Sequence, residues 1–342
     1  MNNFSINWSS GKTEFVFGDF AEAIRQYLPN RKLIFICDER LIELYPEISF
    51  LKPIIKIHAN ENNKSLQFID LIYQKLVEFE ADKHTIIVSI GGGIISDIAG
   101  FLASTFYRGM PLILIPTTLL AMIDAAIGGK NGLNFGKHKN QIGTIRQPEK
   151  IIIDNRFLRT LPNEQIKSGM AEVIKHGIIS GVDLFSEIQQ PENIEQWNKG
   201  VFSDKWIKKI MQVKINIVIN DEFENGNRKI LNFGHTLGHI LEMQENISHG
   251  EAVSLGIIIA AKLSANLKKC TQKTVDQLIK ALSLFNLPIN SNYNIQNIVK
   301  HLESDKKKEG SKINYIFIEN IGHVVVEQIP IEKLKKLILE NV

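Results

Sequence analysis

The chain has 342 residues, of which 44% are hydrophobic and 23% charged, values typical of a globular protein with one large domain or two. The formal net charge of +3 includes no basic tract of the kind that binds nucleic acid, so we expect no nucleic-acid partner. Two cysteines cannot form a disulfide framework, no apolar run approaches the roughly 20 residues that span a bilayer, and the N-terminal segment lacks the pattern of a signal peptide. These features predict a cytoplasmic protein with no membrane partner.

The first half of the chain alternates short apolar strands with amphipathic segments. We predict strands at residues 33–37, 53–58, 85–90, 112–115 and 150–153, and a helix at 65–79. Near-continuous β-branched runs separated by helices are typical of a parallel sheet covered on both faces. The expected fold class is therefore α/β, with a parallel-sheet domain at the N-terminus.

After Leu161-Pro162 the apolar period changes to about 3.6, which predicts helices. We expect them at residues 163–180, 203–220, 232–243, 250–268 and 272–285, followed by one strand at 313–318. Residues 221–227 and 305–310 are polar and predict flexible loops. The change of pattern divides the chain into a domain of residues 1–158 and a mainly helical domain of residues 159–342.

A glycine triplet, Gly91 to Gly93, follows a predicted strand and begins a helix that contains Asp97. Amides in such a turn can approach a pyrophosphate closely, and a helix N-terminus favours negative charge. Asp38 ends another strand, where a carboxylate can hold a ribose hydroxyl, and Thr117-Thr118 ends a third. A tight turn and a helix cap are the simpler alternatives for the glycines and for Asp38. Together these turns favour a dinucleotide site.

A segment rich in glycine and lysine follows, Asp124 to Lys130, with Lys139 and Asn140 a few residues further on. Glycines beside lysines predict a mobile cationic loop that can hold a phosphate or a carboxylate. A solvated basic loop without a ligand is the alternative.

Three histidines and a glutamate carry the strongest indication of chemistry. His235 and His239 lie four residues apart, on one face of a predicted helix, and His249 follows. Glu172 completes a Glu-His-His set with two of the three histidines, a donor set that suits a divalent transition metal. The alternatives are chance spacing for the histidines and a surface ion pair between Glu172 and Lys175.

Ten motifs, in order along most of the chain, resemble the 3-dehydroquinate synthase family of sugar-phosphate cyclases. They are Gly91-Gly-Gly-x-x-x-Asp97, Arg108-Gly109, Pro116-Thr-Thr-Leu-Leu120, Asp124 through Gly-Gly-Lys130, Lys139-Asn140, Glu172-x-x-Lys175, Asp221-Glu-x-Glu224-x-x-x-Arg228, Asn232-Phe-Gly-His235-Thr, His249-Gly-Glu and Asp305-Lys-Lys307.

The resemblance implies a Rossmann-like NAD-binding domain over residues 1–158 and a helical metal- and substrate-binding domain over 159–342, in a homodimer. It implies Zn²⁺, or Co²⁺ in its place, held by Glu172, His235 and His249. His239 then becomes a proton-transfer group beside Glu224, with Lys175 as a further catalytic residue.

The resemblance also implies the residues that bind the two small molecules. The residues that it implies for NAD binding are Asp38, Glu61, Lys64, Gly91, Gly92, Gly93, Asp97, Thr117, Thr118, Lys130 and Lys139. Substrate binding falls to Asp124, Lys130, Asn140, Glu172, Lys175, Lys214, Arg228, Asn232, His235, His249, Lys306 and Lys307, and to Arg108, which is expected to reach the phosphate bound by a neighbouring subunit.

The activity implied is conversion of 3-deoxy-D-arabino-heptulosonate 7-phosphate, an anionic sugar phosphate, to 3-dehydroquinate and phosphate. NAD⁺ transiently oxidises the C5 hydroxyl, phosphate leaves, the hydride returns, and an aldol step closes the ring. The alternatives are a paralogous cyclase of the 2-deoxy-scyllo-inosose synthase or sedoheptulose 7-phosphate type, a metal-dependent polyol dehydrogenase of the same fold, and a non-catalytic nucleotide-binding regulator.

Overall fold

The computed structural model describes residues 3–28, 30–136, 138–290, 296–300, 302 and 311–341. The chain forms two compact units, each discontinuous in sequence. The first unit contains residues 1–162 and 200–215, and the second contains 163–199 and 216–342. Helix α8 (Asp204–Asn220) runs from the first unit into the second. Among the described residues, no helix is long and apolar enough to cross a membrane.

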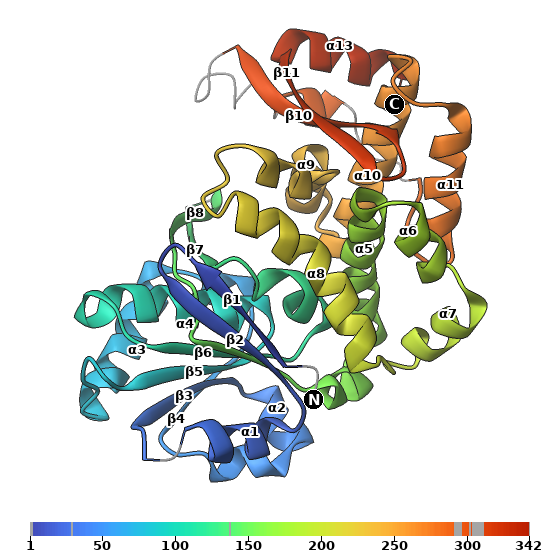
Figure 1. Ribbon diagram of the computed structural model, residues 1–342. Helices are drawn as coiled ribbons and strands as arrows, with labels where there is room; N and C mark the ends of the chain where they lie inside the picture. The colour runs from blue at the N-terminus through green and yellow to red at the C-terminus, as the bar shows by residue number, and fades with distance from the viewer. Residues whose placement is uncertain are drawn as a thin grey trace. The chain divides into compact units, whose positions relative to one another are not determined.

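A seven-stranded sheet forms the centre of the first unit, in the order β1-β2-β9-β6-β5-β3-β4 (Figure 1). All neighbouring strands pair in parallel except β1 and β2, which pair antiparallel. The strands are β1 (Phe4–Trp8), β2 (Gly11–Phe17), β3 (Leu33–Asp38), β4 (Ile54–Ile57), β5 (Ile86–Gly91), β6 (Leu112–Pro116) and β9 (Lys150–Ile153).

The central strands are buried along their length, as expected for strands covered on both faces. Every residue of β5 and β6 is buried, as are five of the six residues of β3. The five strands predicted from apolar runs are all present, and the parallel α/β fold is confirmed. The hairpin of β1 and β2 was not predicted, because polar residues interrupt the apolar ones in both strands.

Helices and short turns connect the strands of the first unit. They are α1 (Phe20–Tyr27), α2 (Arg40–Leu44), α3 (Leu66–Glu78) and α4 (Gly93–Thr105), with shorter helical turns at Pro46–Phe50, Glu61–Asn63, Phe106–Arg108, Ala121–Ala125 and Asn155–Thr160. Of the segment predicted as a mobile cationic loop, Asp124 belongs to a helical turn. Lys130, Lys139 and Asn140 lie in an antiparallel pair, β7 (Lys130–Phe135) and β8 (His138–Ile145). Asn131 supports this pair, because its amide donates to Thr144 Oγ1 at 2.9 Å.

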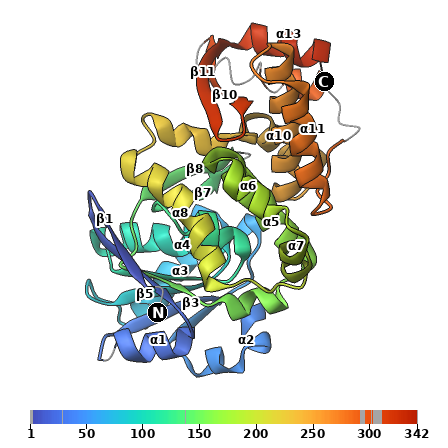
Figure 2. The same cartoon turned by 45° about the vertical axis from the view of Figure 1, so that its right-hand side comes forward.

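The second unit is mainly helical, as predicted. Its helices are α5 (Asn163–Ser180), α6 (Val182–Ile188), α7 (Pro191–Asn198), α9 (His235–Glu245), α10 (His249–Asn266), α11 (Gln272–Ser283) and α13 (Ile331–Asn341), with a short turn, η6, at Asn227–Asn232. The predicted strand pairs antiparallel with a second one that was not predicted, as β10 (Lys312–Asn320) and β11 (His323–Pro330). Figure 2 shows this hairpin beside α13.

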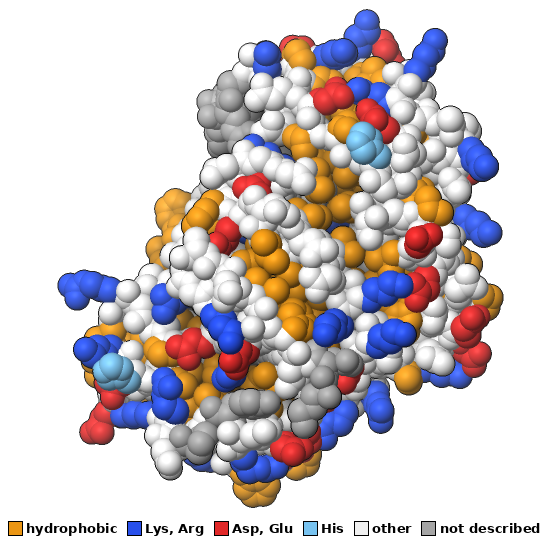
Figure 3. Space-filling model, in the orientation of Figure 1, with side chains coloured by type: hydrophobic (Ala, Val, Ile, Leu, Met, Phe, Trp, Pro, Cys, Tyr) orange, Lys and Arg blue, Asp and Glu red, His pale blue; other side chains and the backbone are white. Residues whose placement is uncertain are grey.

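The surface carries mixed charge. On the face shown in Figure 3, Lys and Arg side chains are scattered among acidic and apolar ones and do not merge into one basic patch. This distribution agrees with the absence of a basic tract in the sequence.

Candidate functional site

The strand order of the first unit identifies where a ligand is expected. β3 is followed along the chain by its neighbour β4, whereas the next strand, β5, lies on the other side of β3. The direction of winding therefore reverses between β3 and β5. In open α/β sheets, ligands bind at the carboxyl ends of the strands at such a switch point. Asp38 ends β3, and the glycine triplet begins at the end of β5.

The glycine triplet forms the sharp turn from β5 into α4 that the sequence predicted. Gly92 is the residue before the helix, and a Cβ on it would lie 2.9 Å from Thr118 Cγ2. Only glycine therefore lets the two loops at the ends of β5 and β6 pass so closely. Because the first amides of a helix have no partner within it, the start of α4 is suited to an anion.

The other residues expected around NAD have local partners. Asp38 is buried and holds Arg40, whose Nη2 lies 2.7 Å from Asp38 Oδ2. Thr117 is buried, and Thr118 Oγ1 accepts from the amide of Ala121 at 3.1 Å. These contacts fix the loops at the carboxyl ends of β3 and β6.

The buried side chain of Lys64 is the centre of a charged cluster in the first unit. Its Nζ donates to Asp97 Oδ2 at 2.6 Å and to Asn140 Oδ1 at 2.5 Å, and lies 4.0 Å from Glu61 Oε1. Burial raises the pKa of Asp97, although Lys64 opposes the shift. Asn134 completes the cluster by donating to Glu61 Oε1 at 2.8 Å. Residues expected to bind NAD thus contact Asn140, which was expected to bind substrate.

Five further site residues of the first unit differ in burial and in their contacts. Lys214 Nζ lies 2.8 Å from Asp124 Oδ1 and donates to the Asp124 carbonyl at 2.8 Å, so these two expected substrate-binding residues are together. Lys130 and Lys139 are exposed on β7 and β8. Arg108 is exposed too, and its guanidinium makes no hydrogen bond or ion pair with any other residue that the structure describes.

In the second unit, α5 carries a buried ion pair. The side chains of Glu172 and Lys175 are 0% and 2% exposed, and Lys175 Nζ contacts Glu172 Oε2. One helical turn separates them, as the i and i+3 spacing predicted. The alternative of a surface pair is wrong, because both side chains are buried. A buried charge persists only where other groups stabilise it, as each of these two does for the other.

Two local features bring His249 to this carboxylate. Ser248 caps α10: Glu251 Oε2 accepts from the Ser248 amide at 2.8 Å, and Ser248 Oγ accepts from the Glu251 amide at 3.4 Å. Gly250 then contacts α5, because a Cβ on it would lie 2.3 Å from Ser168 Cα. The start of α10 therefore packs against α5 one turn before Glu172.

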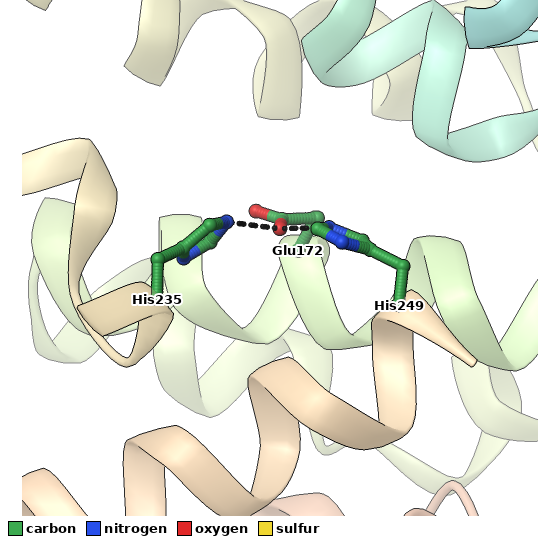
Figure 4. Close-up of side chains that lie close together, drawn as sticks. All are labelled: Glu172, His235 and His249. Atoms are coloured by element: carbon green, nitrogen blue, oxygen red, sulfur yellow. Dashed lines mark hydrogen bonds and ion pairs between the residues drawn. The ribbon is translucent and has the colours of Figure 1, made fainter. Parts of the chain in front are cut away.

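Glu172, His235 and His249 converge on one point, as Figure 4 shows. Glu172 Oε1 lies 3.3 Å from His235 Nε2 and 3.1 Å from His249 Nε2. One potential ligand atom from each residue lies within 4.8 Å of the others, which makes the three a candidate metal-binding group. A carboxylate and two imidazoles form a common three-ligand zinc set that leaves room for a substrate oxygen.

The pKa shifts in this group reflect the shared burial and charge. Burial would raise the pKa of Glu172, but Lys175 and His235 hold it well below its usual value. Burial, aided by Lys175, lowers the pKa of His235. Burial also opposes protonation of His249, yet its hydrogen bonds to Glu172 and Glu242 raise its pKa to about 9. The group thus contains a firmly ionised carboxylate, the form that a cation requires.

His239 and Glu242 lie on the same helix as His235 but have other positions. His239 is exposed, its ring centroid lies 6.5 Å from that of His249, and it is not part of the converging group of described residues. Glu242 was not singled out from the sequence, although it lies seven residues after His235 and so on the same helical face. Its Oε2 lies 3.7 Å from His249 Nδ1.

The remaining expected residues of the second unit lie in and after the loop between α8 and η6. Arg228 is buried, and its Nη1 donates to the Glu222 carbonyl. Asn232 donates to Glu224 Oε1 at 2.7 Å, which joins two residues of the predicted site. Lys306 and Lys307 lie outside the described residues.

Solved structures of synthases and dehydrogenases share this fold. The chain is 25% identical to 2-deoxy-scyllo-inosose synthase complexed with carbaglucose-6-phosphate, NAD⁺ and Co²⁺, with a TM-score of 0.85 and 100% of each chain covered. Glycerol dehydrogenase from Schizosaccharomyces pombe, at 16% identity and a TM-score of 0.65, shares the fold, with 95% of this chain and 88% of that chain covered.

Sequence comparison then gives the family. The models for the N-terminal and C-terminal parts of 3-dehydroquinate synthase match residues 54–168 and 169–308. The 3-dehydroquinate synthase of Rippkaea orientalis is 38% identical over 84% of this chain and 80% of its own. That of Shewanella frigidimarina is 33% identical over 94% and 93%. The chain belongs to the 3-dehydroquinate synthase family.

Proposed function

We propose that the protein converts 3-deoxy-D-arabino-heptulosonate 7-phosphate to 3-dehydroquinate and phosphate, using NAD and a divalent metal. Membership of the family supports this reaction. The observation within the chain that carries the proposal is the convergence of Glu172, His235 and His249. A phosphate-eliminating cyclase needs such a group to hold the hydroxyls of a sugar, whereas a non-catalytic nucleotide-binding protein does not.

The donor chemistry of the second unit fits a zinc or cobalt ion. Two imidazole nitrogens and a carboxylate oxygen meet at one point, and Lys175 contacts the second oxygen of the same carboxylate. A bound ion would polarise the substrate hydroxyls and make the one that is oxidised more acidic. Glu242 lies behind His249, the position at which a carboxylate orients a histidine ligand.

The first unit fits a dinucleotide. Its switch point, the glycine turn at Gly91 to Gly93 and the start of α4 lie at the carboxyl end of the same strand pair. Bound NAD would accept a hydride from the substrate and return it after phosphate has left, so it would be regenerated in every turnover. Lys64 and Asp97, which the structure brings together, are proposed to line this site.

The proposed roles of the chain's other residues follow their charges. Lys175, Lys214 and Arg228 would hold the anionic groups of the substrate, because ammonium and guanidinium groups make strong hydrogen bonds to phosphate and carboxylate. Glu224 and His239 would transfer protons, and Asn232 holds Glu224 Oε1 at 2.7 Å. Lys175 would serve in proton transfer as well as in binding.

We further propose that the active form is a homodimer in which Arg108 binds the substrate phosphate of the partner subunit. The exposed guanidinium of Arg108, without a partner among the described residues of its own chain, supports this role. Mixing Arg108→Ala with His235→Ala protein should restore part of the activity through hybrid dimers. If verified subunit exchange gives no recovery, Arg108 acts within its own subunit or has no role.

The reaction is tested by measuring phosphate release and NADH absorbance with three substrates. They are 3-deoxy-D-arabino-heptulosonate 7-phosphate, glucose 6-phosphate and sedoheptulose 7-phosphate. We expect turnover with the first, with phosphate released in large excess over added NAD and no lasting NADH. Turnover with only one of the others would identify a paralogous cyclase, the alternative favoured by the similarity to 2-deoxy-scyllo-inosose synthase. One NADH formed per substrate would identify a dehydrogenase.

A further inference from the structure

The loop between α8 and η6 has internal hydrogen bonds that its polar sequence did not predict. Residues 221–227 are polar and predict a flexible segment, yet the carboxylate of Asp221 accepts three backbone N–H groups within it. The amide of Asn225 donates to Oδ1 at 2.9 Å, and those of Gly226 and Arg228 donate to Oδ2 at 2.8 Å each. The loop is therefore closed around one side chain.

The same loop holds an unfavourable backbone conformation. Glu224 has a φ of 59°, in the left-handed region that residues other than glycine seldom adopt. Such a conformation persists where surrounding contacts determine it. The carbonyl of Asp221 accepts from the Glu224 amide at 3.3 Å, so Asp221 contacts this residue as well as Asn225, Gly226 and Arg228.

These contacts lead directly to residues of the proposed site. Glu224 Oε1 is held by Asn232, three residues before His235, and the buried side chain of Arg228 donates to the Glu222 carbonyl within the loop. The side chain of Asp221 itself reaches only backbone amides in these bonds. Its carboxylate therefore holds the backbone that carries Glu224 and Arg228 and makes no hydrogen bond to the side chain of either.

We infer that Asp221 is a positioning residue that fixes the loop so that Glu224 and Arg228 face the substrate in the correct geometry. This inference rests on the proposed function for the roles of those two residues. Hydrogen bonds to a carboxylate are stronger than those between neutral groups, which is why one side chain suffices to order the segment. The backbone amides of the loop keep the pKa of Asp221 below its usual value, so the carboxylate is ionised at neutral pH.

The first test compares Asp221→Asn with wild type by hydrogen–deuterium exchange and by kinetics. Asparagine retains one oxygen and presents an NH₂ where the other oxygen accepted. We expect exchange across residues 222–228 to accelerate about tenfold or more, and kcat/KM to fall about tenfold, with zinc content unchanged. Unchanged exchange in a folded variant would overturn the inference. Asp221→Glu keeps the charge but moves the carboxylate, so full activity in that variant would also overturn it.

Asp82 provides a matched control in the first unit. Its carboxylate accepts from the amides of His84 and Thr85 at 2.8 Å each, and from Thr85 Oγ1 at 2.9 Å, but no proposed site residue lies in that loop. Asp82→Asn should accelerate local exchange and leave kcat/KM unchanged. An equal loss of kcat/KM in both variants would mean that loop closure matters only for general stability.

A double-mutant cycle decides whether Asp221 acts through Glu224. If it does, adding Asp221→Asn to Glu224→Gln should lower kcat/KM by about twofold or less, because the group being positioned is already impaired. A further tenfold loss, fully additive, would overturn the part of the inference that concerns Glu224 and leave Arg228 as the residue that Asp221 positions. A wild-type protein without turnover would refute the proposed function, whereas the exchange rates test the fixing of the loop by themselves.

Discussion

Each unit contains a cluster of charged residues around one buried side chain, and the two clusters are built in opposite ways. In the first unit a cation is at the centre, since Lys64 Nζ is surrounded by Asp97, Asn140 and Glu61. In the second unit a carboxylate is at the centre, since Glu172 is surrounded by Lys175, His235 and His249.

In the first cluster the central charge already has its opposite partners, whereas the second cluster can accept a further ion. Lys64 is already surrounded by oxygen acceptors, so this cluster holds together the loop before α3, helix α4 and the pair β7–β8. In the second cluster the Nε2 atoms of two imidazoles lie beside one oxygen of Glu172, and the three potential ligands converge where a cation fits. The same kinds of charged residue thus provide support in one unit and a candidate metal centre in the other.

The largest effect is expected from removing the converging donors. His235→Ala, His249→Ala and Glu172→Gln should each purify with little zinc, because three protein ligands leave no redundancy. His239→Ala should keep its zinc and lose activity by roughly 10²–10⁴-fold, as expected for a proton-transfer group. Metal analysis of the four variants, with turnover measured on the same samples, tests the difference. A zinc-free His239→Ala beside a zinc-replete His249→Ala would reverse the assignment of ligands.

The Lys64 cluster should respond in stability rather than in metal content. Lys64→Met leaves the partly buried Asp97 without its cation, and loss of a hydrogen bond between charged groups costs about 1.5–3 kcal/mol of unfolding free energy. Urea-induced unfolding measures this change. The double variant Lys64→Met with Asp97→Asn, which removes both charges, should recover most of the loss. Zinc content should match wild type in both proteins, and zinc loss would show that the clusters are not independent.

A smaller effect is expected from Glu242, the carboxylate beside the candidate metal-binding group. Glu242→Gln should weaken zinc binding by about 10–100-fold, the usual cost of losing a group that orients a ligand histidine. Competition with a zinc-binding dye measures the affinity. Glu245→Gln, on the same helix, is the matched control, and equal affinities in the two variants would remove Glu242 from the metal centre.

The two clusters should also respond to pH in opposite directions. Burial raises the pKa of Asp97, so above the usual aspartate pKa of about 3.9 the folded state holds more protons than the unfolded one, and stability falls as pH rises. The pKa of Glu172 is lowered despite its burial, because of Lys175, so its contribution is full above about pH 4.3 and is lost as pH falls.

Unfolding free energies measured between pH 3 and 6 in the presence of a chelator test these signs. Relative to wild type, Asp97→Asn should gain stability as pH rises, and Glu172→Gln should gain as pH falls, by at most about 1.4 kcal/mol per pH unit. Parallel curves for wild type and both variants would show that neither carboxylate has a shifted pKa.

Much of the fold was predictable because apolar runs are local and continuous. The strand at 150–153 and the helix at 163–180 have the bounds expected from sequence. Strands β7 and β8 were missed because their residues are polar and glycine-rich, and their pairing depends on Asn131 reaching Thr144 across the hairpin. Such contacts between distant residues leave no periodicity in the sequence.

The candidate site was only partly predictable, because local spacing can be read from the sequence and contacts between distant residues cannot. Helical spacing alone paired His235 with His239, and only the family resemblance selected His249, which lies on another helix. What brings His249 to Glu172 is the contact of Gly250 with Ser168, residues 82 positions apart. The order of the loop at Asp221 was also missed, because it depends on backbone amides that every sequence possesses.

The return of residues 200–215 to the first unit affects how the protein can be synthesised and divided. Asp204 accepts from Asn155 at 2.7 Å, and Lys208 lies over the ring of Phe4 at 4.7 Å. During translation the N-terminal unit cannot acquire these contacts until residue 215 has left the ribosome, after the first helices of the other unit. A fragment ending at residue 162 would therefore expose the surface that α8 covers, and neither unit can be expressed whole as one contiguous piece of the gene.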